Sequence, residues 1–323
     1  MSLAVYAAIV LAWNVLVVLW GAYVRASGSG AGCGAHWPLC NGEVLPRAPE
    51  VATLIELTHR VTSGVALLLV VGLIVWAFRT RAPGDRLRFW AAASGAFIVS
   101  EALLGAGLVL FGLVAEDAST ARAVAMVAHL LNTFALLASL ALATRWAVFD
   151  TALPDPATPR ARLPVLLVGA LAGLLLVAST GAVAALGNTL FPSHSLAEGL
   201  QQDFSATSHF LLRLRVLHHI LGISMGLLAA LAAVVTAFQR GTQSMLQHAG
   251  VVLSLVIVQL FCGVANLLLL APVGVQIVHL LLADALWIAL VVLASAARDP
   301  VAASAVVPAS RTVRPVALVA RKS

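Results

Sequence analysis

The chain has 323 residues, of which 61% are hydrophobic and only 10% are charged, and its formal net charge is +6. This composition excludes an ordinary soluble globular domain and is typical of an all-α integral membrane protein. Eight apolar stretches are each long enough to cross about 30 Å of hydrocarbon. We expect transmembrane helices at residues 3–24, 52–78, 89–111, 122–147, 164–186, 213–238, 248–271 and 274–296.

The basic residues are unevenly distributed between the two sides of these spans. The connections after the second, fourth and sixth spans and the segment after the eighth hold most of them. Because short cytoplasmic loops carry the excess of Lys and Arg, both termini are predicted to be cytoplasmic. The protein is thus expected to be a multi-pass protein of the cell (inner or plasma) membrane, and this topology explains the positive charge without nucleic acid.

Two cysteines, Cys33 and Cys40, lie in the first external loop, in the sequence CGAHWPLC. A disulfide between them is expected because that side of the membrane is oxidising. The alternatives are two free thiols or a metal pair with His36, although the gap between the cysteines is wider than usual zinc spacing. Cys262, inside the seventh span, is expected to be a small buried apolar residue.

Segments of the first half recur in the second half at nearly constant spacing. GAYVRASGSG resembles GAVAALGNTL, ELTHRVTSG resembles RVLHHILG, EALLGAGLV resembles QLFCGVANL, and HLLNTFALLASLAL resembles HLLLADALWIALVV. This internal repeat predicts two tandem four-helix bundles of the same orientation. We expect them at residues 1–150 and 164–297, joined by a cytoplasmic linker at 151–163 and followed by a disordered cytoplasmic tail at 298–323.

Four histidines occupy matching places in this repeat: His59 and His129 in the first half, His218 and His279 in the second. All four are expected near the external ends of their helices. A lone histidine in a span is more often a hydrogen-bonded core residue, but four at equivalent positions favour axial ligands of haem iron. The alignment pairs His59 with His218 and Arg60 with His219, which selects His218 as the ligand.

Other polar residues near these histidines have less specific interpretations. Glu101 and Asp284 lie deeper in their spans and are expected to take part in packing or hydrogen bonds rather than in a proton channel. Cationic residues at the external helix ends are candidates for contact with haem propionates, although snorkelling to lipid headgroups is an equal alternative. These are Arg60, Arg122, Arg213, Arg215 and the neighbouring His219.

The two halves differ beside the first histidine of each pair. Glu56 lies three residues before His59 and shares its helix face, whereas the equivalent residue before His218 is Arg215. A carboxylate beside a haem can stabilise developing positive charge or act as a general base. We therefore interpret the first half as catalytic and the second as holding a haem for electron transfer or structure. The alternative is that Glu56 only pairs with Arg60.

In combination, these motifs resemble the haem A synthase family, over about residues 5 to 297. The motifs that carry the resemblance are Glu56-Leu57-Thr58-His59-Arg60, the loop from Cys33 to Trp37-Pro38-Leu39-Cys40, His129-Leu130-Leu131-Asn132, Gly187-Asn188-Thr189 with Phe191-Pro192, and His279. The resemblance implies an oxidoreductase that converts the C8 methyl of haem O to a formyl group through a hydroxymethyl intermediate. The product, haem A, would supply terminal oxidases.

The resemblance also implies a role for each matching residue. His59 and His129 bracket the substrate haem O, Glu56 is the catalytic acidic residue, and His218 and His279 ligate the iron of a haem B cofactor. Cys33 and Cys40 match the family's loop pair, but the second pair that some members carry is missing from residues 191–210. A haem O synthase and terminal oxidase assembly factors are the expected partners, and homo-oligomer formation is left open.

Two other functions use similar residues. A di-haem cytochrome b also pairs histidines in helical bundles, but its haems are stacked across the bilayer, whereas these histidines are expected near one face. A haem transporter or chaperone would bind haem without requiring Glu56. The sequence also leaves the oxidation mechanism open. Attack by iron-bound oxygen requires His59 or His129 to dissociate, and a site with both ligands favours electron removal followed by attack of water.

Overall fold

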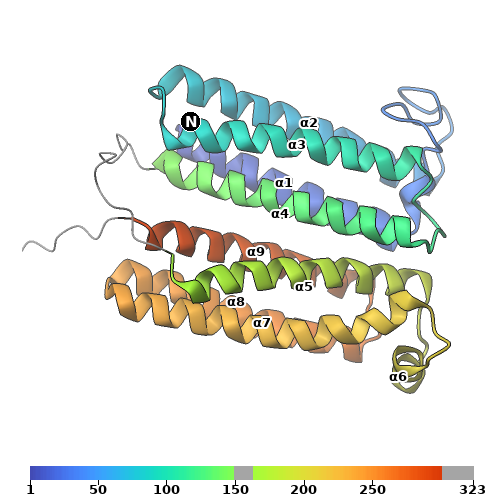
Figure 1. Ribbon diagram of the computed structural model, residues 1–323. Helices are drawn as coiled ribbons and strands as arrows, with labels where there is room; N and C mark the ends of the chain where they lie inside the picture. Colours follow the sequence, from blue (N-terminus) through green and yellow to red (C-terminus); the bar gives the residue numbers. More distant parts are fainter. Residues whose placement is uncertain (149–162, 300–323) are drawn as a thin grey trace, which may run out of the picture.

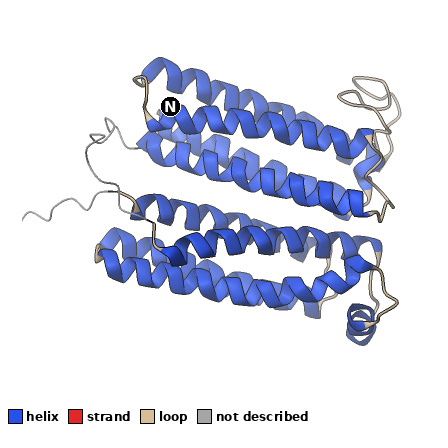
Figure 2. Ribbon diagram, viewed as in Figure 1, coloured by secondary structure: helices blue, strands red, loops and turns tan. Residues whose placement is uncertain are grey.

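The computed structural model describes residues 1–148 and 163–299, and within these ranges it is helical with no strand (Figures 1 and 2). Eight of its helices are long and apolar enough to cross a membrane, which confirms the predicted number of spans. They are α1 (Leu3–Ala26), α2 (Val51–Thr80), α3 (Arg86–Leu110), α4 (Thr120–Val148), α5 (Val165–Leu190), α7 (Phe210–Arg240), α8 (Gln243–Leu268) and α9 (Val273–Ala297).

The helix ends follow local sequence signals. Asp85 and Thr242 precede α3 and α8, and their side chains accept hydrogen bonds from backbone N–H groups of the first turn. Pro272 precedes α9, where its missing N–H costs no intrahelical bond. Gly241 ends α7 with a φ of 63°, a left-handed conformation that glycine adopts without strain.

The long helices form two groups of four that lie side by side (Figure 1). The first bundle contains α1 to α4, and the second contains α5, α7, α8 and α9. α4 packs against α5 and α9, and α1 packs against α9, so these helices form the interface between the bundles. Residues 151–162 of the linker predicted at 151–163 and residues 300–323 of the tail predicted at 298–323 lie outside the described residues. The duplication and the cytoplasmic termini stay predictions.

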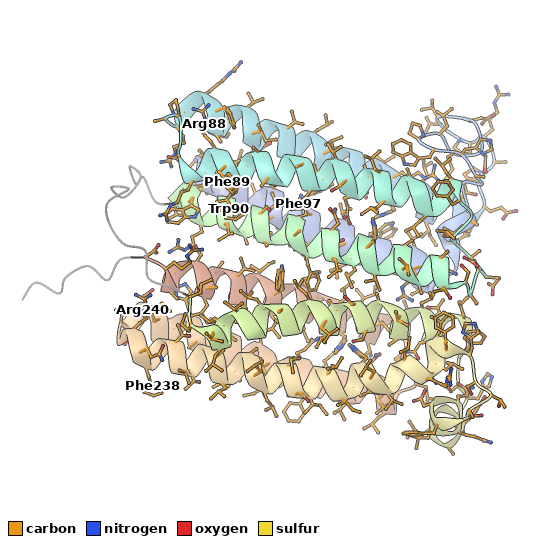
Figure 3. All side chains as sticks on the ribbon, viewed as in Figure 1. Arg88, Phe89, Trp90, Phe97, Phe238 and Arg240 are labelled. Atoms are coloured by element: carbon orange, nitrogen blue, oxygen red, sulfur yellow. A yellow bond between two sulfur atoms is a disulfide. The ribbon has the colours of Figure 1, made fainter. Side chains whose placement is uncertain are left out.

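The bundles have two ends, a terminal end and a loop end. Met1 and Asp299 lie at the terminal end, whereas the disulfide loop (residues 27–50) and α6 (Leu196–Phe204) lie at the loop end (Figure 1). Arginine and aromatic side chains gather at the terminal end, where Arg88, Phe89, Phe238 and Arg240 are labelled (Figure 3). Such a mixture is typical of the boundary between hydrocarbon and water.

Polar contacts join the two bundles at three levels. At the loop end, Arg25 of α1 donates hydrogen bonds to α5 and α9. In the middle, the Trp287 Nε1–H donates to the Phe134 carbonyl over 2.7 Å, and the two rings stack. At the terminal end, Arg145 pairs with Asp299. One large hydrophobic core and one smaller cluster each contain residues of both groups, so the bundles form one packed unit.

Candidate functional site

The four predicted haem-binding histidines lie at one level of the structure. Each lies six to nine residues after the start of its helix, on α2, α4, α7 and α9, and all four helices start at the loop end. At a rise of 1.5 Å per residue, the histidines are about 9 to 14 Å from those helix starts. The prediction that they share one end of the bundles is therefore met, while the side of the membrane that this end faces stays a prediction.

Each of these imidazole rings packs against a glycine of a neighbouring helix. A Cβ atom built on the glycine would lie close to the histidine Cε1: 2.9 Å for Gly21 and His59, 3.8 Å for Gly105 and His129, 3.0 Å for Gly181 and His218, and 3.2 Å for Gly263 and His279. The missing side chains make room for the rings inside the bundles. The predicted repeat pairs Gly21 with Gly181 and Gly105 with Gly263, so the corresponding histidines of the two bundles each have a glycine at the same place.

The spacing of the pair in the second bundle would suit two axial ligands of one iron. The ring centroids of His218 and His279 are 6.4 Å apart and their planes are nearly perpendicular, at 86°. Metal–imidazole bonds are about 2 Å long, so two nitrogens on opposite sides of one ion lie about 4 Å apart, with the ring centres farther out. His218 Nδ1 lies 3.2 Å from the Val177 carbonyl. Donation to this oxygen leaves the Nε2 lone pair free for a metal.

Three of the four rings keep a buried nitrogen without a partner. The Nδ1 atoms of His59, His129 and His279 make no hydrogen bond. Leaving such a polar atom buried costs about 1–3 kcal/mol, and no group of the described residues fixes these three rings through Nδ1. The described residues contain no cluster of three or more metal-ligating side chains.

Glu56 is almost fully buried, 4% exposed, and it is held by the disulfide loop. Its Oε2 accepts a hydrogen bond of 2.9 Å from the Cys33 N–H, and its Oε1 pairs with Arg60. Arg60 also donates to the carbonyls of His36 and Leu39. The Glu56–Arg60 pair considered as an alternative from the sequence is therefore present, and it fixes the loop over the first bundle.

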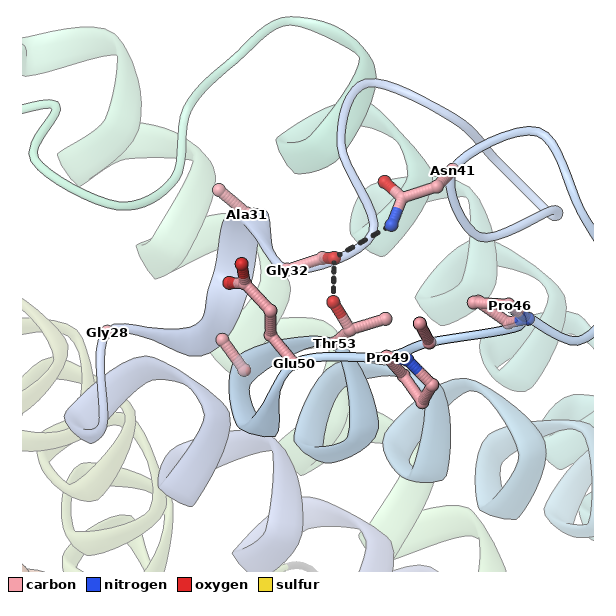
Figure 4. Close-up of a pocket in the computed structure, with 10 residues that line it drawn as sticks. Gly28, Ala31, Gly32, Asn41, Pro46, Pro49, Glu50 and Thr53 are labelled. Carbon is pink, nitrogen blue, oxygen red and sulfur yellow. Dashed lines mark hydrogen bonds between the residues drawn. The ribbon is translucent and has the colours of Figure 1, made fainter.

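The disulfide loop itself agrees with the sequence prediction. Cys33 and Cys40 are bonded, and Cys262 is a free, half-buried cysteine rather than a fully buried one. A cavity of about 480 Å³ lies between this loop and the start of α2 (Figure 4). Gly32 forms part of the cavity wall, and its carbonyl accepts hydrogen bonds from Thr53 Oγ1 and Asn41 Nδ2. None of the four histidines lines this cavity, so it is separate from their sites.

Arg215, the counterpart of Glu56, holds a different loop. It pairs with Asp203 of α6 at 2.6 Å and donates to Asn188 over 2.8 Å. Arg122 donates to two carbonyls of the α3–α4 connection, although its Nε has no partner. These two candidates for propionate contact, like Arg60, are thus already engaged by the protein. His219, the other candidate, follows His218, with ring centroids 6.1 Å apart.

Two features of the loop end were not predicted from the sequence. The short helix α6 lies where a loop was expected. Arg25 had been treated as one more basic residue at a helix end, but its guanidinium donates to the Ala185 carbonyl, to Thr189 and to Gln276.

The sequence profile of the COX15-CtaA family, described as cytochrome oxidase assembly protein, matches residues 4–291. The chain belongs to this family. It is 50% identical over 300 residues to a Protoheme IX farnesyltransferase of Thermus thermophilus, an alignment that covers 92% of the chain but 48% of that protein. The chain therefore spans about half the length of this relative.

Several members named Heme A synthase are similar over shorter stretches. The Heme A synthase of Halalkalibacterium halodurans is 40% identical over 111 residues, which are 34% of this chain and 37% of that protein. That of Symbiobacterium thermophilum is 46% identical over 95 residues, 29% of this chain and 31% of that protein. These matches agree with the resemblance found in the motifs of the sequence.

Proposed function

We propose that this member of the COX15-CtaA family is a haem A synthase, a membrane oxidoreductase. It oxidises the C8 methyl of haem O to a formyl group through a hydroxymethyl intermediate and supplies haem A to terminal oxidases. The observation that carries the proposal is the placement of two histidine pairs at one level, each ring seated against a glycine of a neighbouring helix. The similarity to the Heme A synthases supports the choice of reaction.

The two pairs have different tasks in this proposal. His59 and His129 bind the substrate haem O, and His218 and His279 ligate haem B. When bound, haem B supplies one-electron transfer. The division rests on the residues beside the histidines, since the repeat places an arginine and a glutamine beside the second pair where the first has two glutamates. The hydrogen bond geometry at His218 Nδ1 and the spacing to His279 suit a stable pair of axial ligands.

Glu56 is the catalytic residue in this proposal. It shares a helix face with His59, and its ion pair with Arg60 and hydrogen bond from Cys33 hold the carboxylate at the loop end of the first bundle. In this position it can stabilise positive charge that develops at the edge of the substrate ring, or accept a proton from the reacting carbon. Arg60, Arg122, Arg215 and His219 line the same end and are proposed contacts for haem propionates.

A farnesyltransferase that makes haem O is the proposed partner. The Thermus relative bears that name, and residues that resemble this chain account for only 48% of it. Haem O has an apolar tail that stays in lipid, so transfer between two membrane proteins avoids exposing it to water. We place the protein in the cell membrane with its loop end outside, as the distribution of arginines in the sequence favours. Contact with oxidase assembly factors would serve delivery of the product.

The proposal is tested by extracting haems from the purified protein after co-expression with a haem O synthase, in a host that makes no haem A. Chromatography of the acid-acetone extract is expected to yield haem A or its hydroxymethyl precursor together with haem B. Haem B alone, with haem O present in the membranes, would overturn the proposal and favour a cytochrome b. Unaltered haem O bound to the protein would favour a transporter or chaperone.

A further inference from the structure

A group of hydrogen-bonded polar side chains lies inside the first bundle, between α3 and α4. The Glu101 carboxylate accepts hydrogen bonds from Asn132 Nδ2 and Thr133 Oγ1. Asn132 in turn donates to the Phe97 carbonyl over 2.9 Å and accepts from Ser100 Oγ over 2.6 Å. The carboxylate is thus held in one orientation by neighbours that are themselves held.

In this orientation the carboxylate faces a predicted haem ligand. Glu101 Oε1 lies 3.5 Å from His129 Nε2, and both side chains are half-buried. The other ring nitrogen of His129, Nδ1, is buried without a partner. Where iron binds His129 through Nε2, it uses the nitrogen that lies next to Glu101.

The second bundle lacks this arrangement. At the positions that the repeat aligns with Glu101, Asn132 and Thr133, it has Gln259, Leu282 and Ala283. Gln259 Nε2 lies 3.4 Å from His279 Nε2, a distance similar to that of Glu101, but Gln259 Oε1 has no hydrogen-bond partner. Gln259 therefore lies beside His279 much as Glu101 lies beside His129, but Gln259 is neutral and no neighbour holds its side-chain oxygen.

This difference affects how each histidine can bind iron. A carboxylate is about twice as strong a hydrogen-bond acceptor as a neutral group, and the low dielectric constant of a membrane interior strengthens it further. An imidazole nitrogen that donates its N–H to Glu101 has no lone pair to offer to a metal. Gln259 is a weaker competitor because it is neutral, and an amide oxygen is a weaker hydrogen-bond acceptor than a carboxylate.

We propose that Glu101 is a positioning residue that competes with iron for His129 Nε2, so that His129 is an exchangeable ligand while His279 remains bound. The proposal rests on the proposed function insofar as it takes a haem in each bundle. It extends that function by making His129, on α4, the ligand that the substrate haem can lose. His59, on α2, is then the ligand that stays bound.

The test uses the full-length protein loaded with haem in both bundles, reduced with dithionite and titrated with carbon monoxide. Carbon monoxide binds only where an axial position can open. In the wild type we expect a fraction of the haem to bind it, and Glu101→Gln should lower the apparent affinity of that fraction about tenfold. In the matched reverse variant, Gln259→Glu combined with Leu282→Asn and Ala283→Thr, a second fraction should become reactive.

Haem content per protein and the thermal melting of each variant control for loss of fold. Carbon monoxide binding by Glu101→Gln that equals the wild type, at equal haem content, would overturn the role of Glu101. The variant Asn132→Leu, which removes one donor to the carboxylate, gives a second measurement and should change the affinity in the same direction. Formation of haem A is scored separately, so a protein that makes no haem A but responds to Glu101→Gln would contradict the proposed function alone.

Discussion

The two bundles hold their histidines in the same way and surround them with different charges. In both, each ring packs against a glycine of a neighbouring helix and lies at the same level. In the first bundle the nearby charged residues are Glu56 and Glu101, whereas the second has Arg215 and Gln259 at the aligned positions. In the proposed function, the helices and glycines provide a place for a haem, and the residues beside it decide between reaction and electron transfer.

The loops at the loop end follow the same rule. Residue Glu56 holds the disulfide loop through the Cys33 N–H, and its counterpart Arg215 holds α6 through Asp203. One helix position thus fixes a covering segment over each bundle, with opposite charge in the two cases. The covers therefore differ chemically although the helices beneath them match.

The largest expected effect separates His218 from its neighbour His219. His218→Ala should remove one haem from the protein, because the axial pair with His279 is broken, whereas His219→Ala should retain it. Absorption spectra and haem content per protein measure this difference. Loss of haem from His219→Ala, with haem retained in His218→Ala, would mean that His219 is the ligand and that the repeat alignment is shifted by one residue.

Glu56→Gln should lower the rate of haem O conversion by about 10²–10⁴-fold, the range typical of general acid–base groups, with haem content unchanged. The amide keeps an oxygen for the Cys33 N–H, so the disulfide loop should stay in place. Conversion is measured by chromatography of extracted haems. Arg215→Gln is the matched change in the second bundle, and an equal loss of rate there would contradict the assignment of catalysis to the first.

Gly21→Ala should weaken haem binding in the first bundle, since the new Cβ would lie 2.9 Å from His59 Cε1. Overpacking of this kind costs about 1–3 kcal/mol, or about five- to 150-fold in affinity. Gly64→Ala is the control on α2, because a Cβ there meets nothing within 4 Å. Haem titration of both variants measures the effect, and equal affinities would show that the ring does not need the glycine.

Trp287→Phe should have the smallest effect and concerns the interface between the bundles. It removes the hydrogen bond to the Phe134 carbonyl and should lower the free energy of unfolding by about 0.5–1.5 kcal/mol. Trp13→Phe is the control within the first bundle, where Trp13 donates to the Thr62 carbonyl. Thermal unfolding in detergent compares the two, and haem spectra should remain unchanged in both. A Trp287→Phe protein as stable as the wild type would show that this contact adds nothing to the interface.

Features that depend on hydrophobicity or on spacing along the chain were predictable. The eight spans follow from apolar runs, although α5 extends to Leu190 and α7 begins at Phe210, a few residues beyond the expected ends. The disulfide followed from two cysteines in one predicted external loop. The level of the four histidines followed from their place in the repeat.

Features that depend on side-chain direction or on distant partners were not predictable. Arg25 binds Ala185 and Gln276, which belong to the other bundle, and nothing near Arg25 in the sequence indicates them. α6 has only nine residues and mixes polar with apolar side chains, so it gives no span signal. The contact of Glu101 with His129 depends on rotamers that Asn132 and Thr133 select across two helices.

The common level of the histidines has a consequence for energy coupling. Moving one elementary charge across a membrane potential of 100 mV changes its energy by about 2.3 kcal/mol. The four histidines lie within three residues of one another relative to the starts of their helices. If haems bind at both pairs, as proposed, an electron that passes between them would travel nearly parallel to the membrane plane. Its transfer would do almost no work against the potential, so this step should proceed equally well in energised and de-energised membranes.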